Sequence, residues 1–135
     1  MRLSYLPLLL LLFSHPGSGM AADEEETGEG KTRAAYFSLS PSLITNVQDG
    51  ADYARCEIEL MTLDEKNLED IQLHAPAIRH ELLLLLGDQK GSALKTPSGK
   101  ERFRKQALKA AARVMKEQTG NPSVDDLFFT SYFVE

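Results

Sequence analysis

The sequence predicts an α+β domain: a small sheet of three or more strands with two long helices packed on it, in the order strand, strand, helix, helix, strand. Apolar residues alternate along 36–47 and 54–60, recur at steps of three and four along 64–87 and 98–120, and crowd the terminal stretch 124–135. A period of two indicates a strand and a period near 3.6 indicates a helix, so the order of these periods fixes the fold class.

The first 22 residues have the pattern of a secretory signal peptide. Arg2 precedes the unbroken leucines 8–12, and small residues follow at 18–22. We expect cleavage there and export to the periplasm. The alternative is an inner-membrane anchor formed by residues 3–21, but a spanning helix needs about 20 apolar residues and a His-Pro-Gly sequence at 15–17 interrupts this run.

Composition limits the functions and the structure that the exported chain can have. The full chain has 15 basic and 20 acidic residues, and loss of Arg2 with the signal leaves 14 against 20, a net charge of −6. This acidity argues against nucleic-acid binding. Residues 23–34 are acidic without a large apolar side chain, so we expect a flexible acidic tail before a domain at 35–135. A single cysteine, Cys56, excludes an internal disulfide.

The two early strands are expected to pair through a turn. Pro41 lacks an N–H and is expected at a sheet edge or in a bulge. Asp49-Gly50 is a hairpin turn signal. Along 54–60 apolar and charged residues alternate strictly, which predicts an antiparallel strand with one buried face.

The first helix is expected to begin near Asp64 or Thr62, which can cap it, and to end at Gly87. Pro76 lies inside this span, so we expect a kink there, or two helices that meet.

The second helix is expected to begin with a capping box of Ser98 and Glu101 and to end at Gly120. The terminal stretch 124–135 is apolar on both faces, which predicts a strand inside the sheet rather than at its edge.

No catalytic, metal-binding or cofactor-binding set emerges, so we expect a protein that is not an enzyme. Gly30-Lys31-Thr32 lacks the glycine and the strand of a phosphate-binding loop, and His80-Glu81 lacks a second histidine one helical turn later. His74 is six residues from His80 and lies off that face. Cys56 alternates with core residues and is expected to be an inert apolar group.

The most informative charge feature is the second helix. Nine basic residues and one acid lie between Lys90 and Lys116. Five of them share one helical face and form a candidate docking face: Arg102, Lys105, Lys109, Arg113 and Lys116. This face is either a solvated surface or a docking surface for an acidic partner, a sister subunit or a phospholipid surface.

Four stretches, 36–46, 76–86, 96–104 and 129–135, resemble in order the motifs of the FliL family of flagellar basal body-associated proteins. The first has an aromatic start, a proline and a final asparagine; the second is Pro-x-Ile-Arg-His before a run of leucines; the third contains Gly-Lys-Glu; and the last is a terminal Phe-Thr-x-x-Phe-Val strand. The matching positions in the last three are Pro76, Ile78, Arg79, Gly99, Lys100, Glu101, Arg104, Phe129, Thr130 and Phe133.

The resemblance implies an SPFH/stomatin-like periplasmic domain without enzymatic activity or cofactors. It implies a motor accessory that contacts the flagellar stator, other basal-body proteins or its own oligomer, and that supports motility, chemotaxis and swarming. A cleaved signal departs from the membrane-anchored family pattern and leaves at most a peripheral association with the inner membrane. The alternative is a periplasmic scaffold or binding module of the same fold at another envelope complex or lipid surface.

Overall fold

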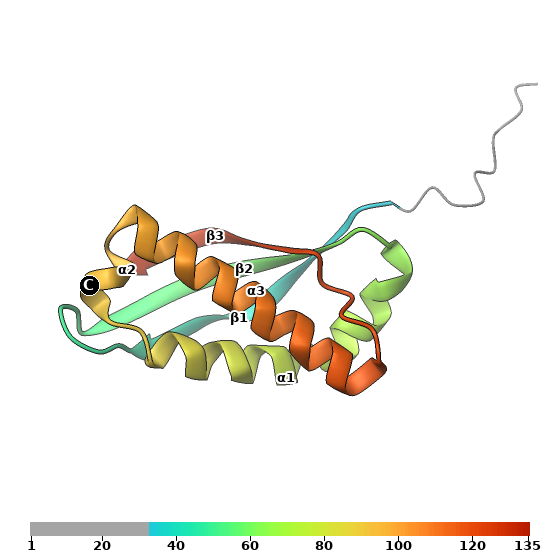
Figure 1. The fold of residues 1–135 in the computed structure, drawn as a ribbon, viewed down its shortest axis with the longest axis horizontal. Helices are drawn as coiled ribbons and strands as arrows, with labels where there is room; N and C mark the ends of the chain where they lie inside the picture. The colour runs from blue at the N-terminus through green and yellow to red at the C-terminus, as the bar shows by residue number, and fades with distance from the viewer. Residues whose placement is uncertain (1–32) are drawn as a thin grey trace, which may run out of the picture. The chain divides into compact units, whose positions relative to one another are not determined.

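The computed structural model describes residues 33–135 (Figure 1). The predicted signal peptide, 1–22, and all but the last two residues of the predicted acidic tail, 23–34, lie outside the described residues, as does Gly30-Lys31-Thr32. The elements in chain order are β1 (Ala35–Asn46), β2 (Tyr53–Thr62), the 3₁₀ helix η1 (Glu65–Asn67), α1 (Leu68–Gly87), α2 (Gly91–Leu94), α3 (Pro97–Thr119) and β3 (Asp126–Val134).

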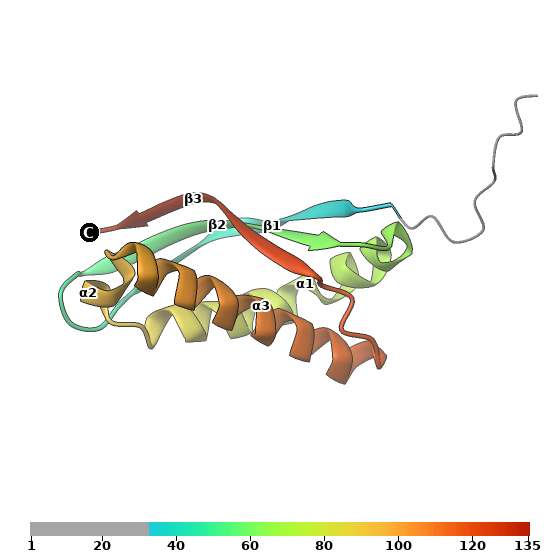
Figure 2. The same cartoon turned by 45° about the horizontal axis from the view of Figure 1, so that its top comes forward.

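The predicted α+β class is confirmed. A three-stranded antiparallel sheet in the order β1-β2-β3 is covered on one face by the helices, as Figure 2 shows. Helix α1 has 20 residues and α3 has 23. The sequence did not predict the short segments η1 and α2, which add to the expected order. No described element covers the other face of the sheet.

The prediction of a central position for the last strand is wrong, because β2 is central and β3 lies at the edge. Glu57 pairs with Ser131 and the next residue, Ile58, pairs with Phe129, so Thr130 is an unpaired extra residue. This bulge reverses which residues point inward. The core-facing residues of β3 are therefore Leu127 and Phe129 before the bulge and Tyr132 and Val134 after it. Because the first two have odd numbers and the last two even numbers, a strict alternation read from the sequence places apolar residues on both faces.

A larger bulge interrupts β1. Leu39 pairs with Ile58 and Leu43 pairs with Cys56, which leaves 40–42 opposite Glu57 alone. The prediction that Pro41 lies at an edge or in a bulge is confirmed on both counts. Three residues opposite one means that β1 has two extra residues, an even number. The alternation of inward and outward side chains along β1 is therefore the same on both sides of the bulge, and Leu39 and Leu43 are both buried.

The β1–β2 connection contains the predicted Asp49-Gly50 turn. Gly50 has a φ of +92°, and a Cβ there would also crowd the backbone of Ser92 at 2.9 Å. The turn therefore holds α2 against the hairpin end of the sheet.

Helix α1 begins after η1, which Asp64 caps by accepting a 3.0 Å hydrogen bond from the Lys66 N–H. The helix continues through Pro76 to Gly87 as one element. In Figure 1 its first turns run at an angle to the rest, as a proline inside a helix favours.

The capping box predicted for α3 is wrong. Thr96, not Ser98, is the N-cap, because its side chain accepts a 3.0 Å hydrogen bond from the Gly99 N–H and Pro97 occupies the first helical position. Glu101 instead binds Arg104. The end at Gly120, in the left-handed conformation with a φ of 81°, is confirmed.

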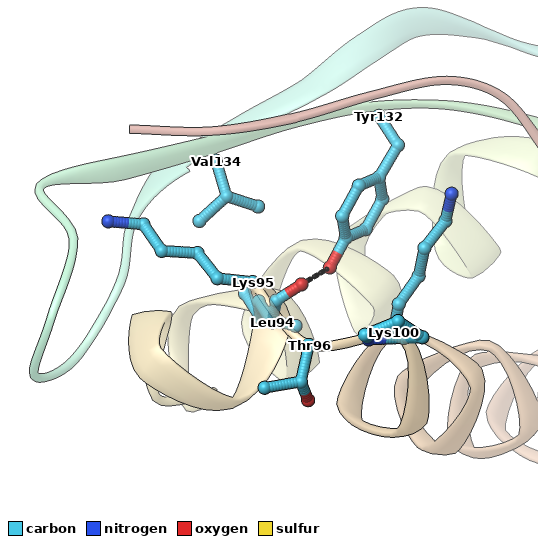
Figure 3. Close-up of a pocket in the computed structure, with 7 residues that line it drawn as sticks. Leu94, Lys95, Thr96, Lys100, Tyr132 and Val134 are labelled. Carbon is cyan, nitrogen blue, oxygen red and sulfur yellow. Dashed lines mark hydrogen bonds between the residues drawn. The ribbon is translucent and has the colours of Figure 1, made fainter.

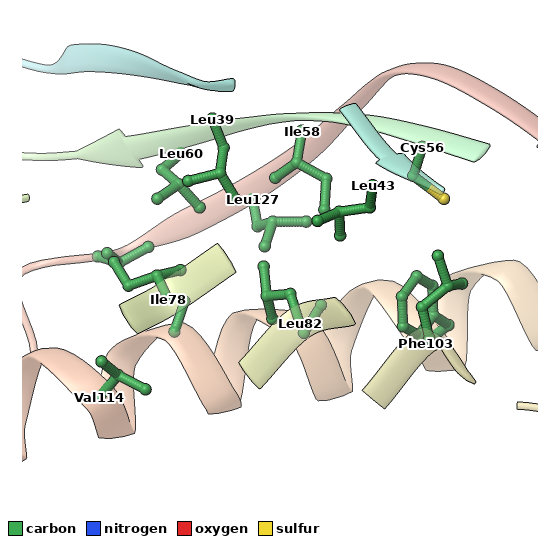
Figure 4. Packing of buried hydrophobic residues seen from close by; sticks show 14 of the residues in the cluster. Leu39, Leu43, Cys56, Ile58, Leu60, Ile78, Leu82, Phe103, Val114 and Leu127 are labelled. Carbon is green, nitrogen blue, oxygen red and sulfur yellow. The ribbon is translucent and has the colours of Figure 1, made fainter. Parts of the chain in front are cut away.

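The core lies between the sheet and the two long helices. Figure 4 shows side chains of the three strands meeting those of α1 and α3. The most deeply buried include Leu60, Ile78, Leu82, Phe103 and Leu127, each at most 1% exposed. Burying one such side chain contributes about 1.5–3 kcal/mol, so this layer fixes α3 firmly on the sheet.

Candidate docking surface

Helix α3 separates its apolar and basic residues on opposite sides. Phe103, Ala107, Ala111 and Val114 point into the core. The five residues of the predicted docking face are all exposed: Arg102, Lys105, Lys109, Arg113 and Lys116. At 100° per residue they fall within one narrow arc, away from the core. The structure therefore brings these five positions together on one solvent-facing stripe, which we call the basic face.

Only one member of the basic face is held by ion pairs among the described residues. The Arg113 guanidinium lies 3.3 Å from the Glu81 carboxylate on α1 and 3.7 Å from Glu117 on its own helix. These pairs are exposed and each is worth at most about 1 kcal/mol. Arg102, Lys105, Lys109 and Lys116 form no ion pair with another described residue.

A hollow of about 570 Å³ opens on the second half of the basic face. The residues that line it are Gln106, Lys109, Ala110, Ala112, Arg113, Lys116 and Pro122. We call it the α3 groove. Its lining is mainly apolar, from the alanines, the proline and the aliphatic stems of the basic side chains. The sequence did not reveal the groove, because Pro122 reaches it from the turn after the helix.

A second hollow, of about 410 Å³, lies where α2, the start of α3 and β3 meet (Figure 3). Its charged groups already have partners. Lys95 donates a 2.8 Å hydrogen bond to the Gly50 carbonyl, and the Lys100 ammonium lies 4.6 Å from the centre of the Tyr132 ring. The Tyr132 hydroxyl donates to the Leu94 carbonyl at 2.7 Å, and burial raises the pKa of Tyr132 to about 12. The two contacts of Tyr132 fasten α2 and α3 to the end of β3, and the Lys95 hydrogen bond joins α2 to the β1–β2 turn.

The two arginines among the family-motif positions each join a helix to an edge strand. Arg79 on α1 donates to the carbonyls of Pro41 and Ser42 in the β1 bulge, at 3.0 and 3.1 Å. Arg104 on α3 donates to Asp126 at 2.8 Å and to the Leu127 carbonyl at 3.0 Å on β3. The sequence pattern around Arg79 and Arg104 did not predict these hydrogen-bond partners on the edge strands.

Arg104 also forms a two-bond contact with Glu101, at 2.7 and 2.8 Å. This hydrogen bonding holds the pKa of Glu101 below its usual range. Gly99 is buried where α3 passes α2, and a Cβ there would collide with the Ala93 carbonyl, so only glycine fits. Lys100 contacts Tyr132 as described. This motif therefore fixes the start of α3.

The remaining motif positions are also mainly structural. Ile78 is fully buried, and the Phe129 ring stacks on Phe103 with 5.6 Å between centroids. Thr130 is the bulge residue of β3. Phe133 is the exception: it is 49% exposed on the uncovered face of the sheet, with its ring centroid 6.1 Å from that of Tyr53. Pro76 is exposed on α1.

The groups considered for chemistry do not converge in the described part of the chain. Cys56 is fully buried, and burial raises the pKa of its thiol to about 12, which opposes formation of the reactive thiolate. His80 is exposed and His74 half-buried. Among residues 33–135 no three His, Cys, Asp or Glu side chains gather closely enough to hold a metal ion. No helix within that range is long and apolar enough to cross a membrane.

Comparison with known proteins identifies the family of the chain. A family model described as "Flagellar basal body-associated protein FliL" matches residues 36–134, from the start of β1 to the end of β3. The curated "Flagellar protein FliL" of Aquifex aeolicus (strain VF5) is 26% identical over 101 residues, which cover 73% of this chain and 60% of that relative. The chain thus spans less than two-thirds of the relative's length.

Proposed function

The chain belongs to the FliL family of flagellar basal body-associated proteins, and we propose that it is a non-enzymatic accessory of the flagellar motor. The observation that carries this proposal is the extent of the family match, which takes in every strand and helix of the described domain. The lack of convergent catalytic groups among the described residues is compatible with it.

The protein acts through contacts with other proteins, either the stator and other basal-body components or further copies of itself, and so supports motility and swarming. The basic face supports this proposal, because four of its five charges are free of ion pairs within the described residues. A charged surface of one sign accelerates and orients the approach of an acidic partner.

The protein works in the periplasm after export, with at most a peripheral attachment to the inner membrane. The sequence of residues 1–22 supports this placement. Its fold is an SPFH/stomatin-like variant of the α+β class, a proposal that rests on the family resemblance and on a three-stranded sheet covered by helices.

Deletion of the gene tests the role in the motor. We expect slower spreading in soft agar, reduced swarming and a weaker response of the motor to load, each restored by the full chain expressed in trans. Flagella counted by electron microscopy serve as the control, since an accessory of torque generation leaves filament number unchanged. Normal swimming, swarming and load response in the deletion strain would refute the proposal.

The alternative, a scaffold at another envelope complex or lipid surface, is favoured only by the charge of the basic face, which also suits anionic lipid. Localisation of a fluorescently tagged full chain separates the two. Foci that coincide with flagellar bases support the motor role, whereas an even envelope signal supports the alternative.

A further inference from the structure

The α3 groove divides the basic face into two unlike halves. Lys109, Arg113 and Lys116 border the groove, whereas Arg102 and Lys105 lie outside it. All five residues are exposed and basic, so the halves share the sign of their charge and differ in shape and apolar lining. A partner that binds only through its negative charge would bind both halves with similar affinity. A partner that fits the groove would bind the groove half more tightly.

The floor of the groove is small and apolar. Ala112 does not pack against the core cluster, and its methyl group lies between longer basic side chains. Pro122 also lines the groove, and so does Ala110, on the opposite side of Arg113. Small residues flanked by long ones leave room for one apolar side chain of a partner, and covering the floor would remove apolar surface from water.

The rim is arranged to receive carboxylates. Arg113 is paired with Glu81 and Glu117, while Lys109 and Lys116 form no ion pair among the described residues. From Gln106 to Lys116 the helix advances about 15 Å, a length that matches some ten residues of a helical partner or about five of an extended one.

We propose that the α3 groove binds an acidic, amphipathic segment of a protein partner. An apolar side chain of this segment rests on Ala112, between Lys109 and Lys116, and its carboxylates pair with these two lysines. The inference deepens the proposed function and rests on it, because it names the surface through which the protein makes its contacts and the chemistry of the partner.

An anionic membrane fits this surface less well. Membrane-surface helices insert large apolar side chains such as Leu, Phe or Trp beside their cations. The large apolar residues exposed in the described domain lie on the strands, on α1 and after β2, and none lies on α3. A flat bilayer would also engage both halves of the basic face equally, since its charge is not confined to one narrow segment.

Binding of a synthetic peptide to the full chain tests the proposal. The probe is a fluorescent peptide of about 15 residues with leucines at helical spacing among glutamates, and its partner probe has serine in place of every leucine. We expect the leucine peptide to bind at least about fivefold more tightly, because it covers the groove floor. Vesicles containing anionic phosphatidylglycerol, offered at the same total charge, are expected to bind more weakly than the leucine peptide.

Charge-matched variants locate the site. Lys109→Glu with Lys116→Glu and Arg102→Glu with Lys105→Glu change the net charge equally, but only the first pair borders the groove. We expect the first pair to weaken peptide binding about tenfold and the second pair by less than about threefold. Ala112→Leu, which fills the floor without changing charge, should also weaken it severalfold. Circular dichroism melts of each variant must match those of the parent chain, and binding is compared only among folded variants.

Three results would overturn the proposal: no preference for the leucine peptide, equal losses in the two charge pairs, or vesicles bound at least as tightly as the peptide. The failure of this proposal differs from failure of the motor role. If deletion impairs motility but Ala112→Leu restores it fully and binds the peptide normally, the groove is refuted and the motor role stands.

Discussion

Replacement of Arg79 tests whether the bulge of β1 depends on α1. The extra residues of the bulge separate part of β1 from its pairing with β2, and the Arg79 guanidinium donates to the carbonyls of Pro41 and Ser42. Arg79→Met keeps much of the side chain's length and apolar stem but removes both donors. The variant therefore isolates the two hydrogen bonds from the packing of the stem.

The expected cost follows from the number of bonds and their exposure. Hydrogen bonds from a charged donor contribute about 1.5–3 kcal/mol when buried, and the partial exposure of these two lowers each to about 1 kcal/mol. Arg79→Met should therefore lower the free energy of unfolding by about 2 kcal/mol and the Tm by about 10 °C. Arg79→Lys, which retains the charge but not the planar pair of donors, should lose about half as much.

Urea denaturation followed by circular dichroism measures these losses. Arg102→Met is the matched control, because Arg102 is exposed and makes no hydrogen bond or ion pair among the described residues. Its cost should stay within about 0.5 kcal/mol. A cost below 0.5 kcal/mol for Arg79→Met, or parental stability for Arg79→Lys, would refute the idea that the guanidinium holds the bulge.

Three further predictions concern the core and the charged contacts. Phe129→Ala should cost about 2–3 kcal/mol in urea denaturation, less than a fully buried phenylalanine, because Phe129 is half-buried although it stacks on Phe103; a loss under 1 kcal/mol would contradict this packing. Cys56 should react with iodoacetamide at pH 8 only as the chain unfolds, since burial raises the pKa of its thiol to about 12, and rapid labelling of the native protein would be inconsistent with that burial. Because the folded thiol has the higher pKa, its contribution to stability is complete below about pH 8.5 and should decline as the pH rises toward 12. The pKa of Glu101 followed by NMR should lie below its ordinary value and rise in Arg104→Met; its contribution to stability, present above the unfolded pKa, should disappear as the pH falls through the folded one.

The α+β class and the approximate position of each main element could be predicted because hydrophobic period reflects burial directly. Along β2, alternation from Ala54 to Leu60 corresponds to alternating buried and more exposed residues in the structure. The apolar face of α3, from Phe103 to Val114, was equally clear. Neither β2 nor α3 has an extra residue within it, so the hydrophobic period in the sequence matches the pattern of buried residues in the structure.

The position of β3 could not be predicted because of Thr130. A single unpaired residue shifts the inward set from odd to even positions, and a sequence pattern cannot distinguish this from burial on both faces. The N-cap of α3 was missed for a different reason: the spacing of Ser98 and Glu101 was preferred over Thr96-Pro97, although proline favours the first helical position. The basic face was visible because it lies on one helix, whereas the groove depends on Pro122 outside that helix.

The two bulges also govern how this sheet can meet other chains. An exposed edge strand is a template for strand addition and aggregation, and proteins protect it with prolines, bulges and charged side chains. The edge at β1 has Pro41, its bulge and the hydrogen bonds from Arg79, and the edge at β3 has the bulge at Thr130. These features hinder two copies of the chain from joining their sheets edge to edge. Within the described domain, helix surfaces and sheet faces are therefore better suited than strand edges to reversible contact between copies.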